Sequence, residues 1–320
     1  MRFSFGDDQL LLAAGLRELL ARECTPAHVR AVWDGRTGHD PALWAKLAGM
    51  GVLGLLLPES DGGTGLDEVD AVLQWQELGR AAAPGPVLEH MAVAAPALRG
   101  TRFAAGLADG SLVATAAGFD ASPYVAHAQI AHIVVTPDGV VPTAGARIVD
   151  IAGIDGGRLL STLAEFRTEP VHFSDQLGFE RGALATAAYL VGSGERMIEL
   201  AAEHARVRQQ FGKPIGSFQA VKHLLADALL KIEFAKPAVY RAAWSVAQRE
   251  PTVARDVSMA KALAGEAAYR AGRSAMQVHG GIGYTWEADL QLWMKKTWAL
   301  MRAWGDSPYH RRRVAEAVTA

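Results

Sequence analysis

The sequence contains a single cysteine, Cys24, in 320 residues. One cysteine excludes an intramolecular disulfide framework and any multi-cysteine metal or iron–sulfur site, and it makes the cytoplasm the expected compartment. The histidines of the central region, His127, His132 and His172, do not have the spacing of metal ligands. We therefore expect no metal site.

An excess of positive charge and a long hydrophobic run are also absent. Lys and Arg number 32 and Asp and Glu number 34, a net charge of −2, so no basic field attracts nucleic acid or an anionic membrane. No run reaches the roughly 18 apolar residues of a membrane span. The amino terminus places Asp7 and Asp8 before a short apolar run, the reverse of a secretory signal. We expect a soluble intracellular protein without a nucleic-acid or membrane partner.

Three segments differ in their periodicity. Residues 1–105 have helical apolar spacing, with a helix predicted to begin at Asp40-Pro41. Residues 106–175 contain short β-branched runs separated by turn signals, enough for roughly five or six strands. Residues 176–320 return to a helical period, typical of an antiparallel bundle. The pattern predicts an α+β fold, mainly α, with a small β domain between two helical domains.

One face of the last segment has a continuous apolar stripe. Its members fall at helical spacing and are Val221, Leu224, Leu225, Ala228, Leu229 and Ile232. Such a stripe predicts a helix whose single apolar face is buried.

The segment before this stripe combines a cation with an aromatic ring. We expect a helix to end at Gly212, with Arg208 on its last turn and Phe211 three residues on, and a new helix to begin with Ser217 as its N-cap. A guanidinium beside an aromatic face suits a pyrophosphate next to an adenine. The alternative is a helix C-terminus in which Arg208 complements the dipole and Phe211 is buried.

A second segment, Gln277–Tyr284, places paired glycines after a helix. Glycines let a ligand approach the backbone closely, and the amide of Gln277 can bond to a nucleotide edge or ribose. The alternative is a helix stop followed by a tight turn.

Together these motifs resemble the acyl-CoA dehydrogenase family over almost the whole chain. Gly51–Glu59 with Gly62–Gly65 is similar to the family's first-domain signature, Arg208–Gln219 to its first flavin half-site and Gln277–Tyr284 to its second. The resemblance implies an α-helical domain, a β domain and a four-helix bundle.

The resemblance also implies FAD bound at a subunit interface, where one subunit's β domain holds the isoalloxazine and the neighbour's bundle holds the adenosine end. Arg208 would then bind the pyrophosphate, Phe211 and Ile215 would contact the adenine side, and Gln219 would contact the linker. Gln277, Gly280 and Gly281 would meet the adenosine and ribose, and Gln210 belongs to the same cofactor-binding set.

The sequence departs from the family at the catalytic base. Family chemistry needs a carboxylate that removes the α-proton of an acyl-CoA thioester, and Trp304 occupies the usual glutamate's place. Some members place the base immediately before an arginine on the first bundle helix, and Glu180-Arg181 matches that dipeptide. The alternative for Glu180 is an acidic residue in a first helical turn, favoured by the dipole.

The β domain is also shorter than is usual in the family. Ala114–Ser122 stands near the place of the segment that contacts the flavin ring in relatives. Short members without the usual glutamate resemble one subunit of α2β2 complexes in actinobacterial sterol side-chain degradation, where a longer partner supplies what is missing.

The resemblance therefore implies an FAD-dependent acyl-CoA dehydrogenase subunit. It would desaturate the α,β bond of an acyl-CoA such as a steroid side-chain thioester, together with a non-identical subunit and an electron-transfer acceptor. Two alternatives stay open: a homo-oligomeric enzyme that uses Glu180 as base, and a non-catalytic scaffold subunit that completes a partner's FAD site.

The carboxy-terminal helices suggest two further features. We expect His310–Arg313 to be a solvated helix end that favours the dipole. Four tryptophans, Trp286, Trp293, Trp298 and Trp304, have a spacing that indicates burial and a contribution to a subunit interface.

Overall fold

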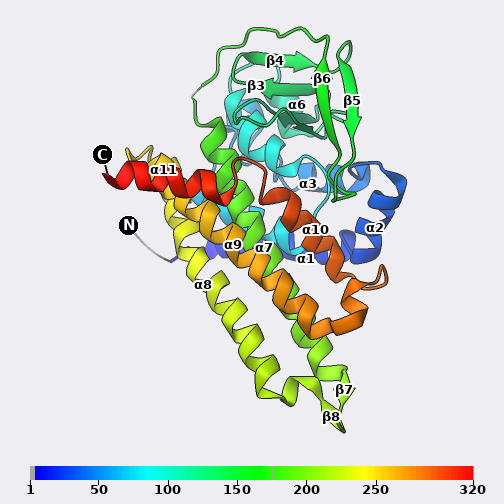
Figure 1. Ribbon diagram of the computed structural model, residues 1–320. Helices are drawn as coiled ribbons and strands as arrows, with labels where there is room; N and C mark the ends of the chain where they lie inside the picture. The colour runs from blue at the N-terminus through cyan, green and yellow to red at the C-terminus, as the bar shows by residue number, and fades with distance from the viewer. Residues whose placement is uncertain (1–3, 175, 320) are drawn as a thin grey trace.

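The computed structural model describes residues 4–174 and 176–319 (Figure 1). The amino-terminal region is helical as predicted. Its elements are α1 (Asp7–Glu23), α2 (Pro26–Gly35), α3 (Pro41–Gly49), η1 (Glu59–Asp61), α4 (Glu68–Arg80), a π-helical turn η2 (Glu89–Ala94), α5 (Ala95–Ala97) and α6 (Ala104–Ala108).

Local capping explains where α3 begins. The Asp40 side chain accepts a hydrogen bond from the backbone N–H of Ala42 at 2.8 Å, and Pro41 occupies the first helical position. An N-cap carboxylate and a proline at this position stabilise a helix start. The helix start predicted at Asp40-Pro41 is confirmed.

The middle region forms two small sheets. One has the order β1 (Ala114–Ala116), β3 (Ile133–Thr136), β4 (Gly139–Pro142), and the other has the order β2 (Val125–Ala126), β6 (Leu160–Ala164), β5 (Arg147–Ile151). β1 is parallel to β3, and the other pairs are antiparallel. The Thr115 hydroxyl donates to the carbonyl of Ala126 at 2.6 Å and links the sheets. These six strands agree with the predicted number.

Three long helices, α7 (Gly178–Val207), α8 (Gln219–Ala247) and α9 (Val253–His279), form the body of the carboxy-terminal bundle (Figure 1). A short turn η4 (Gly280–Tyr284) precedes α10 (Leu290–Leu300), which packs on α7 and α9, and α11 (Ser307–Thr319) packs on α9. One apolar core is continuous from the amino-terminal helices to this bundle. The predicted α+β fold, mainly helical, is confirmed.

The predicted end of α7 was wrong by several residues. The helix stops at Val207, and Arg208 is its extended C-cap. The chain then pairs β7 (Gln209–Gln210) with β8 (Lys213–Pro214) in a hairpin, which provides the backbone partners that a longer helix would have used.

Ser217 is not the N-cap of the following helix. Its hydroxyl donates to the carbonyl of Pro214 at 2.7 Å inside a 3-10 turn, η3 (Ile215–Ser217), and Phe218 is the N-cap of α8. The serine's hydrogen bond is therefore used one turn before the helix begins.

Three burial predictions also fail. Leu229, a member of the predicted buried stripe, is 42% exposed, and Trp286 is exposed, whereas Trp293 and Trp304 are buried. His310 is fully buried, with Nε2 at 2.8 Å from the carbonyl of Trp304 and Nδ1 at 3.1 Å from the Ser258 hydroxyl. Arg311 and Arg312 are exposed as predicted, so the prediction fails at His310 and in its position, because the run lies near the start of α11. Within the described residues, no helix has the length and apolarity to cross a membrane.

Candidate cofactor and active site

The two sequence motifs come together at the outer end of the bundle, where the β7–β8 hairpin lies at the bottom of Figure 1 and the end of α9 lies above it. His204 near the end of α7 and His279 at the end of α9 stack with ring centroids 4.5 Å apart and nearly parallel planes. Burial, with His279 and Arg208 nearby, lowers the pKa of His204. The stack holds the β7–β8 hairpin and η4 on neighbouring parts of one surface.

Phe211 and Arg208 are both open to solvent on this surface. Phe211 sits at the hairpin tip with a positive φ of 54° and is 91% exposed. Arg208 is exposed, and its guanidinium has no ion-pair partner in the described part of the chain. The alternative in which Phe211 is a buried core residue is therefore wrong for this chain.

The other residues of the first motif lie close by. Gln210 is exposed, and its side-chain amide donates to the carbonyl of Gln209 at 2.7 Å. Ile215 is half-buried against the core, and Gln219 opens α8 on the surface. The first motif thus places exposed polar side chains around the half-buried side chain of Ile215.

The second motif leaves bare backbone beside the first. Gln277 is exposed near the end of α9, and Gly280 has a φ of 63°, which favours glycine. A Cβ added at Gly280 or Gly281 would meet no atom within 4 Å. These glycines therefore leave open space against which a ligand can lie.

This set of groups fits one end of FAD. A guanidinium suits a pyrophosphate, an exposed ring suits a planar base, and an amide with bare backbone suits a ribose or base edge. All of them face solvent in the single chain, so the surface can accept a cofactor that a second subunit also contacts.

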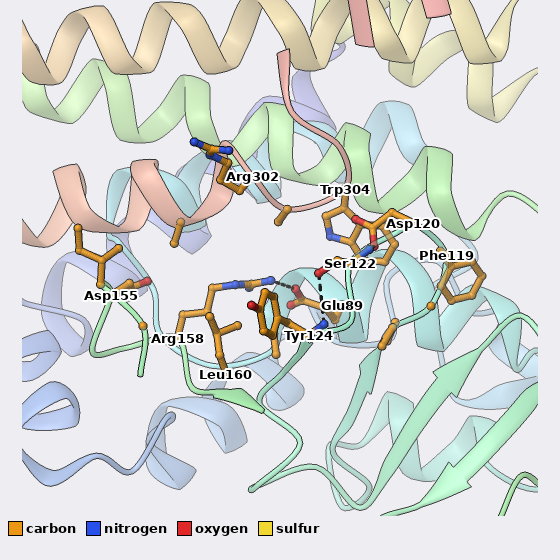
Figure 2. A pocket seen from close by; sticks show the side chains of 18 of the residues that line it. Glu89, Phe119, Asp120, Ser122, Tyr124, Asp155, Arg158, Leu160, Arg302 and Trp304 are labelled. Atoms are coloured by element: carbon orange, nitrogen blue, oxygen red, sulfur yellow. Dashed lines mark hydrogen bonds and ion pairs between the residues drawn. The ribbon is translucent and has the colours of Figure 1, made fainter. Parts of the chain in front are cut away.

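A cavity of about 290 Å³ lies at the other end of the bundle, between the β region and the loop from α10 to α11 (Figure 2). Most of its lining is apolar, from Ala116, Ala117, Phe119, Leu160, Trp298 and Trp304 among others. Part of the segment Ala114–Ser122, expected near the flavin ring, contributes to this wall.

Trp304 forms one wall of the cavity and is tightly packed. Its ring lies 6.0 Å from Phe119 and 6.4 Å from Phe179, and its backbone has a positive φ of 59°. A Cβ at Gly182 would come within 2.5 Å of the indole, so α7 needs a glycine there for the ring to fit. The indole is a fixed part of the wall and cannot serve as a base.

The loop that carries Trp304 is anchored from two helices. Lys261 on α9 donates to the carbonyls of Met301 and Gly305, at 3.3 and 3.1 Å, and His310 on α11 contacts the carbonyl of Trp304. Burial lowers the pKa of Lys261 to about 7 and that of His310 to about 4. His310 is therefore neutral near pH 7.

Two buried ion pairs border the cavity. Arg158 Nη2 lies 2.6 Å from Glu89 Oε1, and Lys296 Nζ lies 2.9 Å from Asp155 Oδ2. Sequence reasoning did not identify Glu89 or Arg158. A single glutamate inside the apolar stretch 86–98 was the available signal, because a buried carboxylate needs a partner.

Glu180, the candidate base, lies outside the lining of this cavity. It stands in the first turn of α7 with its side chain 15% exposed, and Arg313 Nη2 donates to its Oε1 at 3.0 Å. Arg313 also stacks over the Phe179 ring, 5.0 Å from its centroid. The carboxylate is thus engaged by α11.

Comparison with known proteins gives matches to two domains. Residues 6–101 match the model of the acyl-CoA dehydrogenase N-terminal domain, and residues 173–319 match that of the acyl-CoA dehydrogenase C-terminal domain. The acyl-CoA dehydrogenase IpdE2 of Mycobacterium tuberculosis is 35% identical over 301 residues, which cover 91% of each chain.

Solved structures have the same fold. A chain of the ChsE4-ChsE5 complex from Mycobacterium tuberculosis superposes with a TM-score of 0.88 at 25% identity, covering 100% of this chain and 99% of that one. A chain of the Tcur3481-Tcur3483 steroid ACAD variant has a TM-score of 0.88 at 24% identity, with 99% of both chains covered. The chain belongs to the acyl-CoA dehydrogenase family of oxidoreductases.

Proposed function

We propose that this chain is one subunit of an FAD-dependent acyl-CoA dehydrogenase that desaturates the α,β bond of a bulky acyl-CoA, such as a steroid side-chain thioester. It acts together with a non-identical acyl-CoA dehydrogenase subunit in an α2β2 complex. The observation that carries this proposal is the exposed half-site at the outer end of the bundle. There, the side chains of Phe211 and Arg208 are exposed to solvent.

FAD supplies the hydride acceptor of this reaction when it is bound. Arg208 would hold its pyrophosphate by charge-assisted hydrogen bonds, and Phe211 would pack against its adenine. Gln277 and the bare backbone of Gly280 and Gly281 would hold the adenosine. The family membership of the chain and the match between these groups and a dinucleotide support this assignment.

The residues at the two candidate positions of the catalytic base support the need for a second, different subunit. The resemblance to the family places Trp304 at the position of the usual glutamate, and Glu180 is engaged by Arg313 outside the cavity. A partner subunit that supplies its own carboxylate would provide the catalytic base. The solved relative ChsE4-ChsE5 is itself a complex of two differently named chains, and the Tcur3481-Tcur3483 protein is named a steroid ACAD.

The same two observations favour a second candidate, a scaffold subunit that completes the partner's FAD site and contributes no base. Catalysis by a homo-oligomer through Glu180 would require its carboxylate to leave Arg313 and reach the substrate. Variants of Glu180 and of the partner's base separate catalysis through Glu180 from the other two possibilities.

The test is acyl-CoA-dependent bleaching of the flavin absorbance. The chain is purified alone and with a candidate acyl-CoA dehydrogenase partner subunit, and a steroid side-chain CoA thioester is added. We expect bleaching only in the mixture, and we expect it to survive Glu180→Gln. The matched control is Glu165→Gln, which removes a carboxylate from an exposed ion pair with Arg147.

Two outcomes change the assignment, and a third agrees with it. Bleaching by the chain alone contradicts the heteromer. Loss of bleaching in Glu180→Gln with full activity in Glu165→Gln makes Glu180 the base. Bleaching in the mixture that is lost only when the partner's glutamate is changed agrees with the proposal and with the scaffold role, because the partner supplies the base in both.

A further inference from the structure

The stacked histidines at the outer end of the bundle are direct neighbours of the groups assigned to the cofactor. His204 lies one helical turn before Arg208, whose backbone N–H donates to the carbonyl of His204 at 2.9 Å. His279 directly precedes Gly280, which contributes bare backbone to the same surface. The two ring centroids are 4.5 Å apart. The stack therefore joins the two motifs of the candidate FAD half-site.

Both imidazoles can take up a proton without leaving the stack. Nδ1 of His279 lies 2.8 Å from the carbonyl of Ala275, and a carbonyl only accepts, so Nδ1 is the donor and Nε2 is the nitrogen that can gain a proton. Both histidines are only half-buried. Water and a bound anion can therefore reach the pair.

The charges nearest to the stack are positive. Burial, His279 and Arg208 all lower the pKa of His204, and no carboxylate of the described residues opposes this shift. Two stacked rings this close do not titrate independently, because a proton on one ring disfavours a proton on the other. The free chain thus holds the pair mostly neutral near pH 7, beside the fixed cation of Arg208.

The surrounding elements do not supply the missing negative charge. Glu203, the acid adjacent to His204 on α7, accepts from Arg196 at 3.0 Å and is thereby neutralised. Other ionisable side chains at the ends of α7 and α9 and in the hairpin, η4 and the start of α8 are Arg206, Lys213, Lys222, His223, Arg273 and Tyr284. Bases therefore outnumber acids around the stack, which suits an anionic ligand.

We propose that the His204–His279 stack takes up a proton when the diphosphate of FAD binds and that it acts with Arg208 as a second cationic contact for that diphosphate. The inference rests on the proposed function, because it adds two residues and a pH dependence to the assigned half-site.

The direction of the pH dependence follows from the charges. A diphosphate beside the rings favours their protonated form, whereas burial and Arg208 disfavour it in the free chain. The complex therefore binds more protons than the free chain, and affinity rises as the pH falls toward the pKa of the free pair.

The test is isothermal titration calorimetry of the full-length chain with ADP-ribose. This probe carries the adenosine and the diphosphate diester of FAD. A contact between charged groups predicts that ADP-ribose binds at least roughly tenfold more tightly at about pH 5.5 than at about pH 8. Titrations in buffers of different ionisation enthalpy should show net proton uptake.

Two variants assign the effect to the stack. His204→Phe/His279→Phe keeps two aromatic rings but cannot be protonated, so its affinity should be the same at both pH values and its binding should take up no proton. The matched control is His223→Phe, which removes an exposed histidine near the start of α8 and should keep the pH dependence of the wild type.

A measurement on the wild type keeps the proposal testable even where the double variant fails to fold. In NMR titrations of the imidazole nitrogens, ADP-ribose should raise the pKa of the stacked pair. Adenosine lacks the diphosphate and should not raise it.

Binding of ADP-ribose that does not depend on pH overturns the inference, and so does an unchanged pH dependence in the folded double variant. Both results leave the half-site itself in place. Absence of binding at both pH values contradicts the half-site together with the inference. The bleaching experiment above tests the proposed function separately, so the two failures can be distinguished.

Discussion

The functional side chains at the two ends of the bundle differ in their burial and in their pairing within the chain. At the outer end Arg208 and Phe211 are exposed, and Phe211 makes an edge contact with the Phe218 ring, whereas beside the cavity the charges of Glu89, Arg158 and Asp155 are buried and paired within the chain. Water can solvate the first set, so it stays available for another molecule. Buried charges must be matched by the fold itself. The outer end is thus the part that a cofactor and a second subunit can complete.

The largest expected effect comes from breaking a pair at the cavity end. Lys296→Met leaves Asp155 as a buried charge without its partner, and both side chains are almost fully buried. Loss of one member of a buried pair costs about 3–5 kcal/mol of the free energy of unfolding. Urea denaturation followed by circular dichroism measures this loss.

The matched control is Arg147→Met, which breaks an ion pair whose members are both more than half exposed. We expect a change of at most about 1 kcal/mol, since exposed pairs contribute little. Equal losses of unfolding free energy in the two variants would contradict the expected difference between a buried and an exposed ion pair.

The second prediction concerns the outer end. Arg208→Ala removes the cation assigned to the pyrophosphate, and a hydrogen bond to a charged group contributes about 1.5–3 kcal/mol, so flavin affinity should fall by roughly 10- to 160-fold. The midpoint of urea denaturation of the flavin-free chain should not change, because Arg208 is exposed. Flavin content per chain after gel filtration is the readout.

Arg206→Ala is the control for Arg208, because it removes an exposed arginine from the end of the same helix, outside the motif. Unchanged flavin content in Arg208→Ala, or an equal loss in both variants, would contradict the assigned half-site.

The third prediction uses pH to probe the anchored loop. Burial lowers the pKa of Lys261 to about 7, with Asp306 and Asp120 opposing the shift, whereas an unfolded lysine titrates near 10.4. Between these values the unfolded chain binds more protons than the folded chain, so Lys261 makes the protein more stable as pH rises from 7 to 10.

The comparison of wild type with Lys261→Met isolates this group. The difference in unfolding free energy should move in favour of the wild type by at most about 1.4 kcal/mol per pH unit in this window. Parallel stability curves from pH 7 to 10 would show that the buried lysine does not titrate there.

The smallest effect is expected for Phe211. Phe211→Ala removes a ring that is 91% exposed, so the unfolding free energy should change by no more than about 0.5 kcal/mol. Stacking on an adenine contributes about 0.5–1.5 kcal/mol, so flavin affinity should fall by roughly 2- to 12-fold. A clear loss of stability would place the ring in the fold rather than in the cofactor site.

Local signals were enough to predict much of the fold. Asp40 and Pro41 fix the start of α3 through a cap that involves only neighbouring residues, and β-branched runs located the strands β3 and β5. The end of α7 was harder to predict from the sequence, because the β7–β8 hairpin competes with the helix for the same backbone groups.

Long-range pairing could not be predicted. Glu89 and Arg158 are 69 residues apart in the chain, and no spacing rule connects them. Periodicity placed Leu229 on an apolar stripe but does not distinguish a core position from a surface that another subunit covers, and Leu229 is 42% exposed. For the candidate cofactor site, the motifs indicated which residues lie near one another at the outer end but not that Arg208 and Phe211 would be exposed.

The most direct test of the central claim is the flavin content and mass of the chain, measured by absorbance and light scattering during gel filtration. The chain is loaded with FAD either alone or after mixing with its candidate partner subunit. We expect little retained flavin for the chain alone and a yellow α2β2 complex for the mixture. Stoichiometric FAD in a homo-oligomer of this chain alone would contradict it.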